Sequence, residues 1–223
     1  MSSNSAAKYL VSTISDNPKE IFEHLPIFES KGFGGLHFDL MDGSFVPRLG
    51  LHPELLSEIR KNTNLFIEVH IMLQKPSHFL NLIVDSGANR VIFHLETEED
   101  LNGLIRLANN LEVEIGLAIN PLTPATCLAP FLDEIDSVLL MAINPGIPKH
   151  PFLENTFAKL KETRSLVEEI NPKVEIAIDG GVTFSNHKEL LLSGADKLIC
   201  GSGTLFHYEN SLDKNLELLL KLE

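Results

Sequence analysis

The chain has 223 residues, of which 43% are hydrophobic and 22% are charged, proportions typical of a soluble globular protein with one large or two small domains. Its 18 basic and 31 acidic residues give a net charge of −13. This excess of acid disfavours general binding to the phosphate backbone of nucleic acids, but it is compatible with one small anionic ligand held by backbone amides.

Short β-rich runs alternate with amphipathic segments from one end of the chain to the other. The β-rich runs predict strands at 9–14, 35–39, 66–72, 90–95, 113–119, 137–143, 174–179 and 197–201. The segments between them have apolar residues at every third or fourth position, as in Leu101, Leu104, Ile105 and Ala108. They predict helices at about 17–31, 53–61, 76–87, 98–111, 124–134, 152–170, 184–194 and 209–222.

Strands that alternate with helices indicate a parallel sheet covered by helices. Eight such units in a chain of 223 residues fit a closed (β/α)8 TIM barrel better than an open doubly wound sheet. The first strand is not followed by a glycine-rich dinucleotide-binding fingerprint. No linker, low-complexity segment or shift in composition interrupts the pattern. We therefore expect an α/β fold in which residues 1–223 form a single barrel domain.

Cysteine usage and hydropathy bear on the cellular compartment. The two cysteines, Cys127 and Cys200, are too few for a disulfide framework, so we expect reduced thiols in a cytoplasmic protein. No apolar stretch approaches the ~20 residues that a membrane helix needs. The polar N-terminus, MSSNS, lacks the basic and apolar regions of a signal peptide. We expect no association with membranes.

Chemistry in a barrel of this kind lies where strands end at the mouth. His37 and Asp39 stand two positions apart in one predicted strand, so both side chains face the same side. His70 lies in the third predicted strand and Asp179 ends the seventh. Two imidazoles and two carboxylates suit one divalent cation such as Zn²⁺, Fe²⁺, Mn²⁺ or Co²⁺. A cation would also compensate the cost of burying the two carboxylates.

Each of these residues also has an ordinary structural explanation. A single histidine in a barrel is more often structural than a metal ligand, and an aspartate before Gly180 and Gly181 is often only part of a turn. The joint placement of the four residues at the ends of three strands favours the metal site over these separate explanations.

Glycine turns follow the seventh and eighth predicted strands, at 179–181 and 201–203. These two turns are neighbours in a barrel, and with a following helix N-terminus they form a common phosphate site. Glycine lets backbone N–H groups approach an anion closely. The alternative is that they are only tight connections between strand and helix.

Seven motifs, which come in the family's order and span nearly the whole chain, resemble the ribulose-phosphate 3-epimerase family. They are HFDLMDGSFVP at 37–47, VHIM at 69–72, FHLE at 93–96, GLAINP at 116–121, LMAINPG at 140–146, IDGGV at 178–182 and GS at 201–202. The resemblance implies a barrel of the ribulose-phosphate-binding type that inverts one carbinol centre of a ketose phosphate.

The resemblance also implies roles for individual residues. A divalent metal ion, one per chain, would be held by His37, Asp39, His70 and Asp179, with Asp39 and Asp179 as the acid/base pair. Inversion at C3, from D-ribulose 5-phosphate to D-xylulose 5-phosphate, would pass through a metal-stabilised cis-enediolate. Further substrate contacts would come from Ser12, His70, Met41, Met72, Met141, Gly146, Lys149, Gly180, Gly181, Gly201 and Ser202. For the methionines, core packing is the alternative explanation.

The sequence departs from the family in the region that would grip the distal end of the substrate. After the sixth strand, the usual Asn-Pro-Gly-Phe-Gly-Gly-Gln is replaced by NPGIPKH at 144–150. Pro148 has no N–H to offer, and Lys149 is able to compensate with a point charge on the phosphate. Arg48 adds a cation near the mouth, for which a solvated surface position is the alternative.

Three other functions compete with the pentulose phosphate epimerase. One is an epimerase for another ketose phosphate, such as a hexulose 6-phosphate. Another is a lyase or decarboxylase of the same superfamily, disfavoured because the strand ends carry no lysine. A third is a degenerate barrel that binds a ligand without turnover. A homo-oligomer is also expected. The metal's identity and the roles of His94 and Glu96 stay open at this level.

Overall fold

The chain forms a closed barrel of eight parallel strands in sequence order, each hydrogen-bonded to its neighbours, with β8 closing on β1. The structure is a computed structural model, and it describes residues 5–147 and 151–221. The strands are β1 (Tyr9–Ser12), β2 (Gly35–Met41), β3 (Ile67–Met72), β4 (Arg90–His94), β5 (Glu114–Ile119), β6 (Ser137–Met141), β7 (Glu175–Asp179) and β8 (Lys197–Cys200). The predicted (β/α)8 barrel is confirmed.

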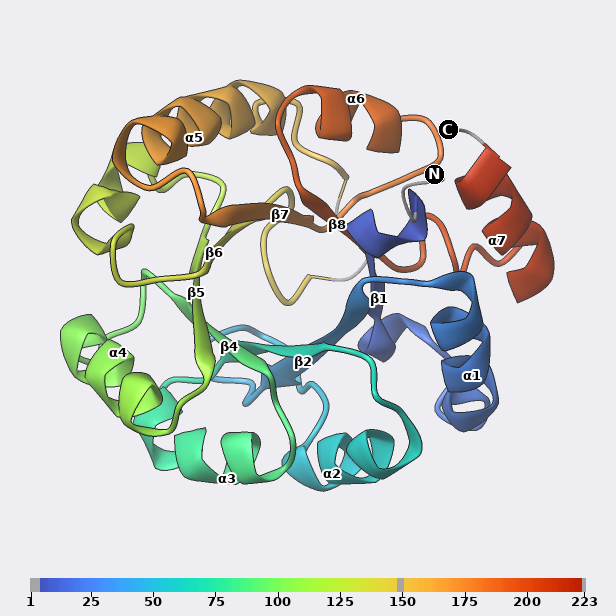
Figure 1. Cartoon of the computed structure of the whole chain (residues 1–223), viewed down its shortest axis with the longest axis horizontal. Helices are drawn as coiled ribbons and strands as arrows, with labels where there is room; N and C mark the ends of the chain where they lie inside the picture. The colour runs from blue at the N-terminus through green and yellow to red at the C-terminus, as the bar shows by residue number, and fades with distance from the viewer. Residues whose placement is uncertain (1–4, 148–150, 222–223) are drawn as a thin grey trace.

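Helices form a ring outside the strands (Figure 1). The α-helices are α1 (Ile21–Lys31), α2 (Pro53–Asn62), α3 (Leu80–Asp85), α4 (Leu101–Asn110), α5 (Thr156–Ile170), α6 (His187–Leu192) and α7 (Leu212–Lys221). Short 3-10 helices occur at η1 (Ser5–Lys8), η2 (Thr13–Ser15), η3 (Pro76–His78) and η4 (Ala125–Phe131). None of the helices within the described ranges is long and apolar enough to cross a bilayer.

The prediction of an ordinary helix at 124–134 was wrong in type, because η4 occupies most of this segment as a 3-10 run. Pro124 stands immediately before the run and Pro130 lies inside it. Proline lacks the N–H that an α-helix interior requires, and its ring clashes with the preceding turn. The buried residues Ala125 and Leu128 still cover the barrel, so the segment fulfils the packing role that its apolar spacing indicated.

Alternation along each strand divides the side chains between two environments. Leu36, Phe38 and Leu40 of β2 join the core between the barrel and the helix ring. A second apolar cluster fills the barrel itself, with residues from β1, β4, β5, β6, β7 and β8: Leu10, Ile92, Ala118, Leu139, Met141, Ala177 and Ile199. The interior is therefore a packed core, and polar chemistry is confined to its two ends.

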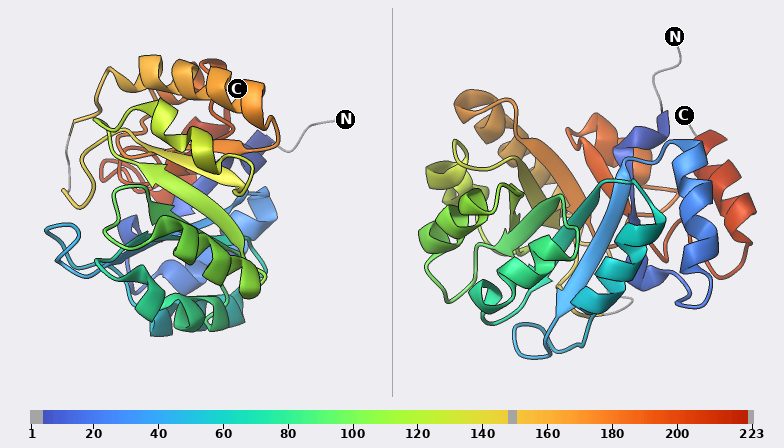
Figure 2. Two further views of the ribbon diagram at one scale, coloured as in Figure 1. Left: turned by 90° about the vertical axis from the view of Figure 1, so that its left-hand side faces the viewer. Right: turned by 60° about the horizontal axis from the view of Figure 1, so that its bottom comes forward.

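The loops at one end of the barrel are the longer ones. In the left view of Figure 2, the connections after β2 and after β6 extend past the strands on the same side. The loop after β2 folds back on its own strand, since the N–H groups of Gly50 and Leu51 donate to the carbonyls of Met41 and Asp39. This end is the one toward which all eight parallel strands run, and it carries the candidate site.

Candidate metal centre and active site

Four side chains from three strands converge at the mouth of the barrel. His37 and Asp39 face inward from β2, His70 from β3 and Asp179 from the last position of β7. Asp39 and His70 are direct register partners across β2 and β3. One ligand atom from each of the four residues lies within 4.8 Å of the other three. The structure thus brings together all four residues that the sequence singled out.

Strand β2 is longer than the sequence predicted. It continues past Asp39, where the predicted strand ended, to Met41, whereas β3 ends at Met72 as predicted. His37, Asp39 and His70 are inward residues within their strands, because the pairing of β2 with β3 continues to Met41 and Met72. These two methionines form an apolar rim beyond the polar cluster.

The cluster is withdrawn from solvent to different degrees. Both imidazoles have fully buried side chains, whereas 7% of the Asp39 side chain and 18% of the Asp179 side chain are exposed. Asp39 Oδ1 lies 3.3 Å from His37 Nε2 and 3.2 Å from His70 Nδ1. Asp179 Oδ2 lies 4.0 Å and 3.9 Å from the same two nitrogens. Asp179 is therefore the member that stands nearest the opening.

The arrangement fits a divalent cation. His37 Nε2 is buried and has no hydrogen-bond partner among the described residues, so a ring nitrogen faces the centre of the cluster without a proton acceptor or donor of its own. Two carboxylates buried side by side repel each other unless a positive charge compensates them. Two imidazole nitrogens and two carboxylate oxygens are a donor set that Zn²⁺, Fe²⁺, Mn²⁺ and Co²⁺ all accept.

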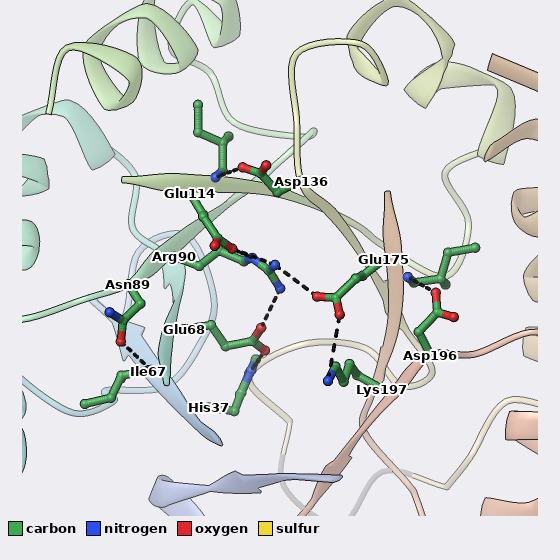
Figure 3. A network of polar contacts seen from close by, with 12 residues as sticks. His37, Ile67, Glu68, Asn89, Arg90, Glu114, Asp136, Glu175, Asp196 and Lys197 are labelled. Atoms are coloured by element: carbon green, nitrogen blue, oxygen red, sulfur yellow. Dashed lines mark hydrogen bonds and ion pairs between the residues drawn. The ribbon is translucent and has the colours of Figure 1, made fainter. Parts of the chain in front are cut away.

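A chain of polar contacts extends from His37 toward the end of the barrel opposite the mouth (Figure 3). His37 Nδ1 lies 2.6 Å from Glu68 Oε1, and the other Glu68 oxygen lies 3.6 Å from Arg90 Nη1. Arg90 Nη2 is also 2.7 Å from Glu114 and 3.0 Å from Glu175. Because Glu68, Arg90, Glu114 and Glu175 are inward positions of β3, β4, β5 and β7, they form a charged floor under the apolar interior.

His70 has a different support. Its Nε2 lies 2.8 Å from Nε2 of His94, the last residue of β4, and His94 Nδ1 lies 3.0 Å from Glu96 Oε2. The ring centroids of His70 and His94 are 5.0 Å apart and the ring planes are inclined by 23°, so the two rings meet end to end at their Nε2 atoms. Phe45, from the loop after β2, packs against His94 with the two ring centroids 5.0 Å apart.

The environment drives the pKa values of the two aspartates in opposite directions. Burial alone raises the pKa of Asp39, but the neighbouring His37 and His70 lower it overall. Burial raises the pKa of Asp179, and the nearby Asp39 carboxylate adds to the effect, so the net shift is upward despite the two histidines. Separated pKa values in a carboxylate pair are the condition for one group to act as base and the other as acid.

The histidines show the same contrast. Burial lowers the pKa of His37, yet the Asp39, Glu68 and Asp179 carboxylates outweigh it and raise this pKa well above its usual value. Burial lowers the pKa of His94 to about 4, and its bond to Glu96 offsets this only in part. His94 is therefore a neutral imidazole at pH 7.

The predicted substrate residues surround the cluster. Met41 and Met72 pack together with Val46, and Met141 is the register partner of Asp179 across β6 and β7. Ser12 ends β1 with its hydroxyl 3.0 Å from that of Ser15. All these residues come from the mouth ends of their strands, so their predicted substrate roles are compatible with the fold.

The two predicted phosphate turns touch each other. A β-carbon at Gly203 would lie 2.3 Å from the carbonyl oxygen of Val182, so the turn after β8 packs directly on the turn after β7. Gly180 and Gly181 have φ values of +94° and +66°, which L side chains rarely adopt. Gly201 lies against Ser12 and Ser15, beside the end of β1. Ser202 follows it and is exposed.

The loop after β6 closes over the loop after β2. Gly146 adopts φ +74°, and a β-carbon there would lie 2.5 Å from the Val46 side chain. The predicted phosphate contact Lys149, with Pro148, lies outside the described residues.

Cavities lie at both ends of the barrel. A cavity of about 310 Å³ opens at the mouth, where Phe45, Glu96, Asn120 and Pro145 are among its lining residues. A larger cavity of about 900 Å³ lies at the floor, where Arg90 is among its lining residues, and none of the four clustered residues lines it. Cavity volume therefore does not identify the candidate site in this protein. The buried set of metal-binding side chains identifies it instead.

Sequence reasoning missed the supporting residues. Glu68 and Arg90 had no predicted role, and His94 and Glu96 were left open between support and structure. A usable signal was present, since Glu68 stands two positions before His70 and Arg90 four before His94, which places these charges on the inward faces of β3 and β4. Charged residues at inward barrel positions need partners.

Comparisons with known proteins agree with this geometry. The sequence model of the "Ribulose-phosphate 3 epimerase family" matches residues 9–205. Ribulose-phosphate 3-epimerase of Aquifex aeolicus is 36% identical over 168 residues, which cover 75% of this chain and 76% of that protein. The Chlamydia pneumoniae enzyme of the same name is 36% identical over 197 residues, covering 87% and 86% of the two chains.

Solved structures with low sequence identity share the fold alone. The tryptophan synthase α-subunit from Pyrococcus furiosus has a TM-score of 0.71 at 14% identity, covering 97% of this chain and 98% of that one. A 3-hexulose-6-phosphate synthase has a TM-score of 0.68 at 12% identity, covering 94% and 97%. On the family match and the sequence identity of its relatives, the chain belongs to the ribulose-phosphate 3-epimerase family.

Proposed function

We propose that this protein is a metal-dependent epimerase that interconverts D-ribulose 5-phosphate and D-xylulose 5-phosphate by inverting C3. The observation that carries this proposal is the convergence of two imidazoles and two aspartates at the barrel mouth, with ligand atoms within 4.8 Å of one another. Membership of the epimerase family and the names of the relatives support the same activity.

Inversion requires proton removal from one face of the carbon and proton delivery to the other. Asp39, with its lowered pKa, is suited to remove the C3 proton, and the electron pair left behind forms the C2–C3 double bond of an enediolate. Asp179, with its raised pKa, is suited to return a proton to the opposite face. In the reverse direction the two carboxylates exchange roles.

The residues that would hold the cation are His37, Asp39, His70 and Asp179. When bound, a divalent cation supplies Lewis-acid stabilisation of the charge that develops on the two enediolate oxygens. The protein fixes the positions of both carboxylates through their strands, so little reorganisation is needed when the proton moves. The apolar rim formed by Met41 and Met72 excludes bulk water from the reacting carbon.

The phosphate of the substrate would lie at the barrel mouth, over the adjoining turns after β7 and β8. Backbone N–H groups around Gly180, Gly181, Gly201 and Ser202 are the donors in this proposal. Gly180 and Gly181 have positive φ values, which L side chains rarely adopt, and the absence of side chains there lets the backbone approach an anion closely. Gly146 and Lys149, from the loop after β6, would complete the contacts. An anion held in this way is compatible with the strongly acidic composition of the chain.

A second candidate is an epimerase for another ketose phosphate, such as a hexulose 6-phosphate. The observation that favours it is the loop sequence NPGIPKH at 144–150, which lacks the usual second and third glycines of the family. This change leaves the metal and acid/base residues untouched and alters only the region proposed to contact the phosphate. Substrate length, rather than chemistry, is therefore what separates the two candidates.

A substrate panel in D₂O tests both candidates. The metal-loaded enzyme is incubated with ribulose 5-phosphate, a hexulose 6-phosphate and the free ketoses, and deuterium at C3 is followed by NMR. We expect fast incorporation and epimer formation with ribulose 5-phosphate. Exchange confined to a longer phosphate would establish the second candidate instead. Exchange with none of them, in protein that binds one transition metal per chain, would leave a barrel that binds without turnover.

A further inference from the structure

The two histidines of the cluster present different ring nitrogens to its centre. His37 directs Nε2 inward, 3.3 Å from Asp39 Oδ1, while His70 directs Nδ1 inward, 3.2 Å from the same oxygen. A histidine binds a cation only through a nitrogen that carries no proton, so the ring's remaining proton must be on the other nitrogen. The two residues therefore need opposite tautomers, and each must be set by what its outer nitrogen contacts.

The tautomer of His37 is set directly. Its outer nitrogen, Nδ1, lies 2.6 Å from Glu68 Oε1, and a carboxylate is only able to accept. With a cation bound, the one ring proton of His37 is therefore on Nδ1, where it donates to Glu68, and the lone pair of Nε2 faces the cation site. A carboxylate that orients a metal-binding histidine in this way is a recurrent arrangement in proteins.

The outer nitrogen of His70 has no carboxylate beside it and meets a second imidazole instead. His70 Nε2 and His94 Nε2 lie 2.8 Å apart, both fully or almost fully buried, so one of them donates and the other accepts. The remaining nitrogen of His94, Nδ1, lies 3.0 Å from Glu96 Oε2 and must donate to it. The two Nε2 atoms share a single proton, and because His70 must leave Nδ1 free for the cation, this proton belongs to His70 and His94 Nε2 accepts it.

Glu96 is itself held firmly. Its second oxygen, Oε1, accepts the N–H of Asn120 at 2.8 Å and the hydroxyl of Thr123, both in the loop after β5. The His94 ring also lies against Phe45, with ring centroids 5.0 Å apart. Because the Glu96 carboxylate accepts from His94 Nδ1, this carboxylate sets the direction of the hydrogen bonds along the chain.

We propose that His94 and Glu96 are positioning residues that hold His70 in the Nε2–H tautomer, so that its Nδ1 lone pair points at the cation. The inference rests on the cation site of the proposed function, and it assigns to these two residues a role in metal affinity. Glu68 contacts His37 directly, whereas Glu96 acts on His70 through His94. The structure thus uses two carboxylates, the buried Glu68 and the partly exposed Glu96, to set two opposite tautomers.

The decisive measurement is the tautomer itself. Uniformly ¹⁵N-labelled protein is loaded with Zn²⁺, without substrate, and the ring nitrogens are assigned in long-range ¹H–¹⁵N spectra by single histidine substitutions. We expect His94 to carry its proton on Nδ1, His70 on Nε2 and His37 on Nδ1. A His94 proton on Nε2 would overturn the proposal, as would a His70 that binds Zn²⁺ through Nε2.

Metal affinity provides the second readout. His94→Phe removes the acceptor for His70 Nε2–H while keeping a ring, and Glu96→Leu removes the final carboxylate. We expect each to weaken Zn²⁺ binding about 10–100-fold in competition with a chromophoric chelator. His94→Gln offers a carbonyl oxygen to His70 and should recover part of the loss. Because Glu96→Leu leaves both rings in place, it provides the test if His94→Phe does not fold.

His24→Phe is the matched control. His24 Nδ1 also lies 2.9 Å from a carboxylate, that of Asp16, and within the described residues this pair makes no hydrogen bond or ion pair with the four clustered residues. The Zn²⁺ affinity of the His24→Phe variant should equal that of the wild type. Unchanged affinity in both His94→Phe and Glu96→Leu would overturn the proposal.

The outcomes separate the inference from the proposed function. A protein that binds no Zn²⁺ at all contradicts both. A protein with the expected tautomers and affinities but no exchange at C3 contradicts only the epimerase activity. A protein that exchanges the C3 proton but shows the other His94 tautomer contradicts only the inference.

Discussion

Glu68 Oε1 and His37 Nδ1 lie 2.6 Å apart with both side chains buried, so the barrel floor is joined to the candidate metal centre by one short hydrogen bond. Glu68→Gln keeps the size of the side chain but replaces the carboxylate with a neutral amide, whose NH₂ end is able to face Nδ1. We expect Zn²⁺ or Co²⁺ affinity to fall about 10–100-fold. Competition titration measures this, and wild-type affinity in the variant would contradict the role of Glu68.

Arg90 compensates Glu68, Glu114 and Glu175 at the floor of the barrel (Figure 3). Arg90→Met leaves the buried Glu68 carboxylate without its cation. We expect the free energy of unfolding to fall by about 3–5 kcal/mol, as for other broken buried ion pairs. Urea denaturation of the metal-free protein measures this loss.

The double variant Glu68→Gln with Arg90→Met is the control for this prediction. It removes the charge that Arg90→Met leaves unpaired, so it should be more stable than Arg90→Met alone. A double variant whose loss equals the sum of the two single losses would show that the two charges do not interact.

Asp39→Asn and Asp179→Asn each remove one carboxylate of the acid/base pair while preserving side-chain shape. We expect each to abolish epimerisation, with a loss of at least about 10²–10⁴-fold, because a neutral amide neither accepts nor returns the C3 proton. The assay follows solvent deuterium at C3 and the appearance of the epimer. Exchange at the wild-type rate in both variants would reject the assignment.

Removal of the cation should affect both activity and stability. Treatment with a chelator leaves two close carboxylates uncompensated, so we expect loss of C3 exchange and a lower Tm. Readdition of Zn²⁺, Fe²⁺, Mn²⁺ or Co²⁺ in turn should restore Tm by an amount that grows with metal concentration. With free metal at about 100 times Kd, the stabilisation is about 2.7 kcal/mol. If neither the chelator nor added metal changes Tm, the proposed metal site is contradicted.

The two cysteines should differ in reactivity. Cys127 is exposed and Cys200 is buried at the end of β8, where burial raises its pKa to about 12. A thiol reagent should therefore modify one cysteine rapidly in the native protein and the second only after unfolding. Rapid modification of both thiols in the native state would contradict the burial of Cys200.

The same pKa has a consequence for stability. The Cys200 thiol stays protonated in the folded state while the unfolded thiol ionises near pH 9, so the unfolded state binds fewer protons between about pH 9 and 12. Stability therefore falls as pH rises through this range, by about 1.4 kcal/mol at pH 10. Cys200→Ala should remove this part of the pH dependence, and Cys127→Ala should retain it.

Much of the architecture was readable from the sequence because it depends on local pattern. Runs with β-branched residues, separated by segments of helical spacing, indicated eight strands in the correct order. The prediction failed at 124–134, where Pro130 lies inside a 3-10 segment, and at the end of β2, which continues past the predicted Asp39 to Met41. Strand ends are decided by pairing with neighbours, which local spacing does not contain.

The four clustered residues were also predictable, because each stands at an inward position of a predicted strand. Their supports were not. Glu68 reaches Arg90 across neighbouring strands, and the Nε2 atoms of His94 and His70 meet only because β3 and β4 are adjacent. Residue type and order along the chain are local properties. The choice of which imidazole nitrogen faces the centre depends on distances between side chains far apart in sequence, and these exist only once the barrel has closed.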